Sequence, residues 1–132
     1  MAQNLNTLDE NQSEDKKGVF YILGIYENFA SFDPKLVETL ANTTNILEWL
    51  IKRVDLNIVD SNSIVFDSNR QYSSEILAIF LQNSNDIRLK FIELKGVETL
   101  LQIISRYRKK DPYDNEEIEF MENIFGCLYS LL

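Results

Sequence analysis

The sequence contains no histidine among its 132 residues. This absence excludes histidine-ligated metal sites and the serine–histidine and cysteine–histidine pairs that activate catalytic nucleophiles. Neither a phosphate-binding glycine loop nor the Asp-rich spacing of a calcium loop is present. Carboxylate pairs such as Glu116 with Glu117, or Glu27 with Glu122, could form acid–base couples, but no histidine accompanies them. We therefore predict that the chain is not an enzyme and uses no cofactor or metal.

The chain also has a single cysteine, Cys127, and lacks any long hydrophobic run. One cysteine excludes an internal disulfide and fits a reducing compartment. Without about 18 consecutive apolar residues, we expect no membrane-spanning helix. Residues 1–17 are polar and lack the apolar stretch of a secretory signal. We interpret them as a polar N-terminal segment ahead of one folded domain over 18–132.

Basic residues are scarce: 13 Lys and Arg stand against 21 Asp and Glu, which gives a net charge of −8. A phosphate backbone would be repelled at long range, so we expect no direct binding of nucleic acid. A basic peptide or a basic protein tail would instead be attracted. The alternative interpretation is that the acidity serves solubility alone.

The stretch 72–107 shows three apolar-periodic segments separated by two short breaks. Its first segment carries apolar residues at the three- and four-residue spacing of a helix buried on one side. The polar residues 83–85 interrupt this pattern, and Gly96, which tolerates a left-handed conformation, ends the short second segment. A long, a short and a medium helix in this order are typical of an armadillo unit of roughly 40–47 residues.

The same order of segments occurs earlier in the chain. A shift of 51 residues places Ile46 on Val97 and Leu50 on Leu101. The breaks between segments match under the same shift. We therefore predict an all-α fold, an armadillo-like right-handed superhelical solenoid of about two repeats. The expected helices lie near 18–30, 34–42, 46–56, 71–82, 85–94, 97–109 and 115–131.

Several local signals support these boundaries. Asp33 followed by Pro34 predicts a capped helix start, and Asn45 with Glu48 resembles a capping box. Gly24 lies inside a helix, where we expect a neighbouring helix to pack closely. The basic run 106–110 at a helix C-terminus is explained by the helix dipole.

The residues 57–70 form a loop of unusual length, rich in Asn, Asp and Ser. We expect its apolar triplet 64–66 to pack onto the solenoid. The loop could be a binding loop, but we favour a tethered insertion.

Two asparagines stand in long helices beside a glutamate, as Glu27-Asn28 and Glu122-Asn123. Asparagines in the third helices of armadillo units can hold a peptide backbone with both amide groups. We name Asn28, Glu27, Asn123 and Glu122 as candidate peptide-binding residues, with surface or capping roles as the alternative. Trp49, on an apolar stripe, is assigned to the core.

The last residues, 127–132, are mostly apolar, whereas a solenoid ends in a repeat with a polar outer face. We expect a piece of a longer repeat protein, with self-association through this truncated C-terminal helix.

Several segments of the chain together match one known family. They are Gly18-Val19, Glu27–Ala30 with Phe32, Trp49–Arg53, Ser74–Ile79, Gly96-Val97 with Leu100–Gln102, and Met121–Asn123 with Phe125. In these segments the chain resembles the beta-catenin-like protein 1 family. The resemblance covers nearly the whole chain in order. The loop 55–63 is longer than in the family, and Met1-Ala2 replaces upstream family sequence.

The resemblance implies a nuclear armadillo-type adaptor associated with the spliceosome. Its partners would be proteins of the complex that contains a Prp-type ubiquitin ligase and a Myb-like splicing factor, bound through basic, nuclear-localisation-type segments. No Trp stands four residues before Asn28 or Asn123, so an importin-style Trp and Asn ladder is not carried over. The alternative function is structural: self-association within a longer helical solenoid, with the partner site elsewhere.

Overall fold

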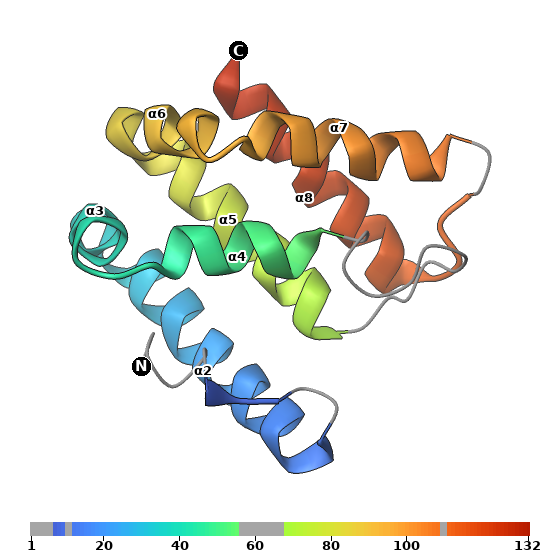
Figure 1. Ribbon diagram of the computed structural model, residues 1–132, viewed down its shortest axis with the longest axis horizontal. Coiled ribbons are helices and arrows are strands. Elements are labelled where there is room, and N and C mark those ends of the chain that lie inside the picture. Colours follow the sequence, from blue (N-terminus) through green and yellow to red (C-terminus); the bar gives the residue numbers. More distant parts are fainter. Residues whose placement is uncertain (1–6, 10–11, 56–67, 109–110) are drawn as a thin grey trace.

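The computed structural model describes residues 7–9, 12–55, 68–108 and 111–132 (Figure 1). Helices account for nearly all of these residues, and no strand occurs among them. The helices are α2 (Ser13–Phe32), α3 (Pro34–Thr43), α4 (Ile46–Val54), α5 (Ser68–Asn83), α6 (Asn85–Glu93), α7 (Gly96–Tyr107) and α8 (Asn115–Leu131). The predicted all-α solenoid is confirmed.

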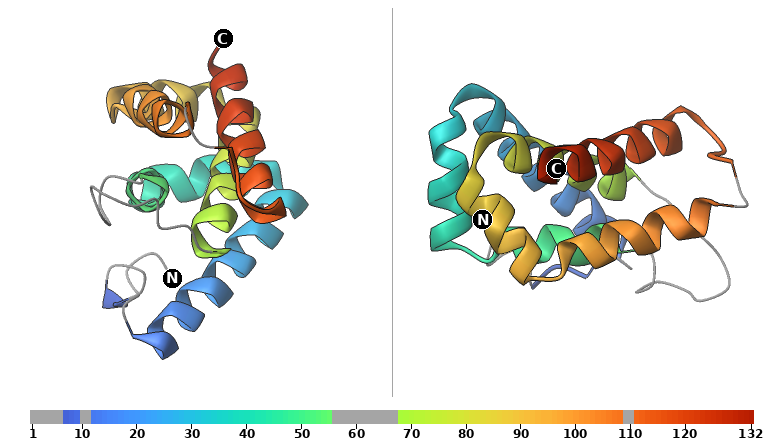
Figure 2. Two further views of the ribbon diagram at one scale, coloured as in Figure 1. Left: turned by 90° about the vertical axis from the view of Figure 1, so that its right-hand side faces the viewer. Right: turned by 90° about the horizontal axis from the view of Figure 1, so that it is seen from above.

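The three long helices α2, α5 and α8 form one layer and run side by side in the same direction (Figures 1 and 2). Helices α4 and α7 form a second layer in front of them, and the short helices α3 and α6 connect the two layers. The chain therefore contains the long helix α2 followed by two units of three helices, α3–α5 and α6–α8.

Helix α5 lies at the centre of the molecule, because it packs against both α2 and α8. Leu77 and Phe80 of this helix are completely buried, as are Leu23 on α2 and Ile124 on α8. Each such side chain stabilises the fold by about 1.5–3 kcal/mol relative to an exposed position. The apolar core thus fixes the lateral order α2, α5, α8.

Side chains cap two of the breaks between helices, and the cap predicted at Asp33 is confirmed. Asp33 Oδ1 accepts a hydrogen bond from the Lys35 amide at 3.0 Å, at the start of α3. Ser84 Oγ accepts from the Ile87 amide at 3.3 Å, at the start of α6. Each cap satisfies one of the amides that a helix leaves without an internal partner.

The predicted capping box of Asn45 and Glu48 is not formed, because the Asn45 side chain makes no capping bond. The neighbouring Thr44 takes this role: its Oγ1 accepts from the Ile46 amide at 3.3 Å. The same hydroxyl donates to the Leu40 carbonyl at 2.5 Å and so links the end of α3 to the start of α4.

The prediction of a left-handed Gly96 is wrong, since Lys95 takes that conformation with φ 61°. Gly96 begins α7, and a Cβ at that position would overlap the ring of Phe91. A glycine is needed here because α6 approaches closely, not because the backbone turns. At Gly24 the Tyr72 hydroxyl of α5 lies 3.6 Å from the Cβ position, which is an ordinary van der Waals contact, so α5 lies beside Gly24 but does not require a glycine there.

Some predicted boundaries differ from the structure. Helix α2 begins at Ser13 within the expected polar segment, and α5 begins at Ser68, so Arg70 belongs to a helix and not to a loop. Arg70 is almost completely buried, and its Nε donates to the Arg53 carbonyl at 3.1 Å. The triplet 64–66 and residues 109–110 lie outside the described residues. Trp49 is partly buried against the core.

A buried polar cluster joins the end of α7 to the start of α8. The Tyr107 hydroxyl donates to Glu117 Oε1 at 3.1 Å, and the Tyr113 amide donates to Glu117 Oε2. Burial, followed by the charge of Glu117, raises the pKa of Tyr107. The tyrosine therefore remains a hydrogen-bond donor, as the Glu117 carboxylate requires.

Candidate functional site

The four candidate residues lie on two helices that do not adjoin, because α5 separates α2 from α8. Asn28 and Glu122 are exposed, whereas Glu27 and Asn123 are partly buried. Asn123 Nδ2 donates to the Ser74 hydroxyl on α5 at 3.1 Å, so the amide of Asn123 links α8 to α5. The predicted residues therefore do not meet as one cluster.

Helix α5, which lies between α2 and α8, supplies a further carboxylate, that of Glu75. Glu75 interacts electrostatically with Glu27 of α2 and with Glu119 of α8. We call these three residues, one from each long helix, the acidic row. Sequence patterns do not identify Glu75 and Glu119, because nothing in the neighbouring sequence indicates which helix each carboxylate faces.

Polar contacts between the long helices hold the acidic row in place. The Tyr72 hydroxyl donates to Glu27 Oε2 at 3.4 Å. Gln71 Nε2 donates to Glu119 Oε2 at 3.1 Å. Each outer carboxylate of the row is thus oriented by a neutral side chain of α5.

The row carries uncompensated negative charge. Burial, followed by the charges of Glu27 and Glu119, raises the pKa of Glu75. Within the described part of the chain, none of the three row carboxylates forms an ion pair, whereas Glu48 pairs with Lys52 at 3.4 Å. Like charges without a cation between them favour a cationic ligand.

Aromatic rings lie next to one end of the row. Phe20 packs edge-to-face on Tyr72, with ring centroids 5.5 Å apart, and on Tyr21 at 6.0 Å. Phe20 and Tyr21 are both exposed. An aromatic face beside a carboxylate suits a lysine or arginine side chain, because the ring attracts the cation while the carboxylate pairs with it.

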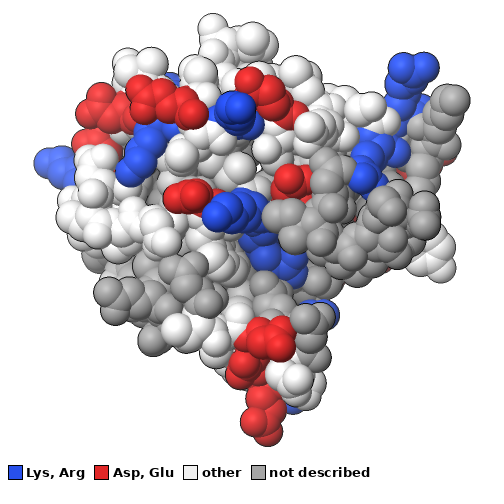
Figure 3. All heavy atoms as spheres, viewed as in Figure 1, with Lys and Arg blue, Asp and Glu red and all other residues white. Residues whose placement is uncertain are grey.

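The charge pattern differs on the opposite layer. Figure 3 shows the side of α4, α6 and α7, where acidic and basic side chains are interspersed. Such a mixed surface has no sign preference, so the acidic row remains the better candidate for binding a basic segment.

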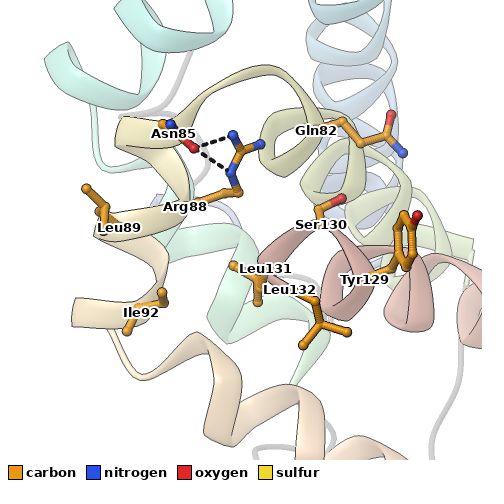
Figure 4. A pocket seen from close by; sticks show the side chains of 9 residues that line it. All are labelled: Gln82, Asn85, Arg88, Leu89, Ile92, Tyr129, Ser130, Leu131 and Leu132. Atoms are coloured by element: carbon orange, nitrogen blue, oxygen red, sulfur yellow. Dashed lines mark hydrogen bonds between the residues drawn. The ribbon is translucent and has the colours of Figure 1, made fainter.

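A groove of about 900 Å³ lies between α6 and the end of α8 (Figure 4). Its lining comprises Gln82, Asn85, Arg88, Leu89, Ile92, Tyr129, Ser130, Leu131 and Leu132. Arg88 is held by the Asn85 side chain and by the Leu81 carbonyl, the latter at 2.6 Å. The groove has no acid–base pair, and its apolar walls suit a packing partner rather than a reaction.

Neither a metal site nor a membrane-spanning helix occurs in the part of the chain that the structure describes. Among the described residues, no cluster of three or more cysteine and carboxylate side chains could hold a metal ion. None of the helices in the same part of the chain is sufficiently long and apolar to cross a membrane.

Comparison with known proteins gives a consistent result. The profile of a family described as "Catenin-beta-like, Arm-motif containing nuclear" matches residues 1–132. The chain is 40% identical to the beta-catenin-like protein 1 homolog of Schizosaccharomyces pombe over 132 residues. It is 40% identical to beta-catenin-like protein 1 of Mus musculus and 39% identical to that of Homo sapiens, again over 132 residues. All of this chain is covered in each case, but it spans 22% of each relative's length.

Proposed function

The chain belongs to the catenin-beta-like family of Arm-motif nuclear proteins, and on this premise we propose that it is a nuclear adaptor for basic peptide segments. The family is described as nuclear, which agrees with the location that the sequence resemblance implies. The proposed ligand is a lysine- and arginine-rich segment of the nuclear-localisation type, carried by a partner protein.

The acidic row supports this proposal. Glu27, Glu75 and Glu119 come from three parallel helices, and in the described structure they lack cationic partners. A basic segment lying across the three helices would meet one carboxylate on each. The net charge of −8 would steer such a segment towards the protein before contact.

Asn28 and Asn123 have different roles in this proposal. Asn28 is exposed on α2 and free of the packing between long helices, so its amide can reach a peptide backbone. Asn123 uses Nδ2 to bind Ser74, which leaves its carbonyl oxygen to accept from a peptide amide. Glu122, exposed on α8, would add charge next to the row.

We propose splicing factors as the partners, since the family resemblance implies the complex of the Prp-type ubiquitin ligase and the Myb-like splicing factor. The chain would act by binding and would catalyse no reaction.

Titration of a fluorescent basic segment from the Myb-like splicing factor tests the proposal. We expect saturable binding that weakens from low to moderate salt, since screening reduces attraction between exposed charges. A scrambled peptide of the same composition should bind less tightly. Absence of binding to the folded chain would refute an adaptor surface within these residues.

A structural role is the second candidate function, and the exposed apolar side chains of α8 favour it. Phe125 is 52% exposed and Tyr129 is 80% exposed on this helix. In this case the chain would contribute to a larger helical assembly, and partners would bind elsewhere.

A further inference from the structure

Two aromatic rings and one carboxylate meet where α5 packs on α2. The rings of Phe20 and Tyr72 stand at an interplanar angle of 83°, with their centroids 5.5 Å apart. At its other end, the Tyr72 side chain donates a hydrogen bond to Glu27 Oε2 at 3.4 Å. Tyr72 of α5 therefore links Phe20 to Glu27 on α2, and we call these three residues the aromatic corner. Its members come from two neighbouring long helices, so the corner is formed within the chain.

Gly24 lies between the two members of the corner that α2 supplies. Phe20, Gly24 and Glu27 share one side of this helix, because residues three and four apart are neighbours on a helix. A glycine inside a helix costs about 1 kcal/mol relative to alanine. The Tyr72 hydroxyl, 3.6 Å from the Cβ position of Gly24, does not require this glycine. What the glycine does provide is space beside the Tyr72 hydroxyl and the Glu27 carboxylate that no α2 side chain fills.

The corner also retains an exposed ring and an unused acceptor. Phe20 is 41% exposed, and Tyr72 and Glu27 are both partly buried. Within the described residues, Glu27 Oε1 accepts no hydrogen bond, since Tyr72 donates to Oε2. Ring surface and a carboxylate oxygen are thus available side by side to a single ligand group.

A guanidinium group fits these features better than an ammonium group. It is planar, so it can stack on an aromatic ring and also donate two parallel hydrogen bonds to a carboxylate. An ammonium group is a compact, strongly hydrated charge without a plane to stack. We propose that the aromatic corner is an arginine-selective subsite, in which one arginine of the bound basic segment stacks on the rings and pairs with Glu27. This inference rests on the proposed function, because it concerns the same ligand.

Lysines on α2 restrict where the guanidinium group can lie. Lys16 and Lys17, one turn before Phe20, line a hollow of about 430 Å³ on the far side of that ring. Their charges would repel a cation placed in the hollow. The arginine therefore lies on the Glu27 side of Phe20, where the nearest charge is negative.

The test titrates the fluorescent basic segment in two forms, one with arginine and one with lysine at every basic position. The whole chain should bind the arginine form about fivefold more tightly, the effect expected of a cation–π contact at an exposed site. Phe20→Leu should weaken binding of the arginine form to the affinity of the lysine form. Phe29→Leu is the matched control, because Phe29 is 44% exposed on the same helix but outside the corner. It should keep the preference for arginine.

The outcomes separate this inference from the proposed function. Equal affinity of the whole chain for the two forms would overturn the subsite but not the adaptor function. Absence of binding by either form would overturn both. A preference that persists in Phe20→Leu would overturn the subsite, since arginine would then be recognised elsewhere.

Circular dichroism verifies that each variant is folded. If Phe20→Leu unfolds, Glu27→Gln replaces it, because an amide offers the guanidinium group one acceptor oxygen where a carboxylate offers two. We expect this variant to lose most of the preference for arginine, and an unchanged preference would overturn the subsite.

Discussion

The hydroxyl of Tyr72 on α5 donates a hydrogen bond to Oε2 of Glu27 on α2, 45 residues away in sequence, at 3.4 Å. This bond orients a carboxylate that has no cationic partner among the described residues. Burial raises the pKa of Tyr72, and the charge of Glu27 raises it further, so the hydroxyl keeps its proton. A neutral donor thus holds the acidic row in position without cancelling its charge.

Replacement of Glu75 by Gln should stabilise the fold while it weakens peptide binding. The folded-state pKa of Glu75 is raised above the reference value of 4.5. The titration of Glu75 therefore contributes favourably to the free energy of unfolding below pH 4.5, and this contribution is lost as pH rises through the folded-state pKa. At pH 7 we expect Glu75→Gln to increase the free energy of unfolding by less than about 1 kcal/mol. Urea unfolding at pH 7 and at a pH below 4.5 measures this difference.

The increase in the free energy of unfolding that Glu75→Gln causes at pH 7 should vanish at the lower pH, because a protonated Glu75 is neutral like glutamine. Glu98→Gln on the exposed side of α7 is the control with the same charge change. Destabilisation by Glu75→Gln at pH 7 would show that the carboxylate has a favourable partner after all.

Two glycines should respond oppositely to alanine. A methyl group at Gly96 would overlap the Phe91 ring, so Gly96→Ala should cost about 1–3 kcal/mol of overpacking. Gly126, inside α8, has open space at its Cβ position, with no atom beyond its own stretch of helix within 4 Å. Gly126→Ala should therefore gain up to about 1 kcal/mol from helix propensity. Equilibrium unfolding in urea compares the two variants, and equal effects would refute the proposed role of α6 packing.

Removal of the Glu117 side chain should strongly destabilise the junction of α7 and α8. Glu117→Ala leaves the Tyr107 hydroxyl and the Tyr113 amide without their acceptor, at a cost of about 3 kcal/mol. The pKa of Tyr107 should also fall, because the charge and the hydrogen bond of Glu117 both raise it. Urea unfolding and ultraviolet titration of tyrosine measure these effects.

Glu116→Ala is the matched control for this cluster. Glu116 is exposed and accepts from the Ser68 hydroxyl at 3.2 Å, so we expect a loss below about 0.5 kcal/mol. Similar losses for both variants would contradict the importance of the buried cluster.

Features set by neighbouring residues could be predicted from sequence, and features set by distant ones could not. The Asp33 cap depends on a bond to the second residue after it, and it forms as expected. Gly96 was assigned the wrong role because Phe91 of the preceding helix, and not the turn, requires a glycine there. The burial of Arg70 depends on the carbonyl of Arg53, which lies 17 residues earlier in the sequence, so no local pattern predicts the contact.

In the candidate site, too, features set by neighbouring residues can be predicted from sequence, and features set by distant residues cannot. Glu27 and Asn123 can be named from the sequence because each stands at a recognisable position in a long helix, and their binding role remains a prediction. Glu75 cannot be named in this way, because its place in the proposed site depends on the charges of Glu27 and Glu119 on the two helices beside it. Sequence periodicity predicts which side of α5 is polar, but the lateral order of helices decides what that side faces.

The most direct test compares two triple variants in the titration of the basic segment. Glu27→Gln, Glu75→Gln and Glu119→Gln together neutralise the acidic row, while Glu14→Gln, Glu93→Gln and Glu98→Gln change the net charge equally at exposed positions elsewhere. The adaptor account predicts at least a tenfold weaker Kd, about 1.4 kcal/mol, for the row variant and a much smaller loss for the control. Equal weakening by the two variants would mean that overall charge, and not the acidic row, attracts the peptide, and would contradict the account.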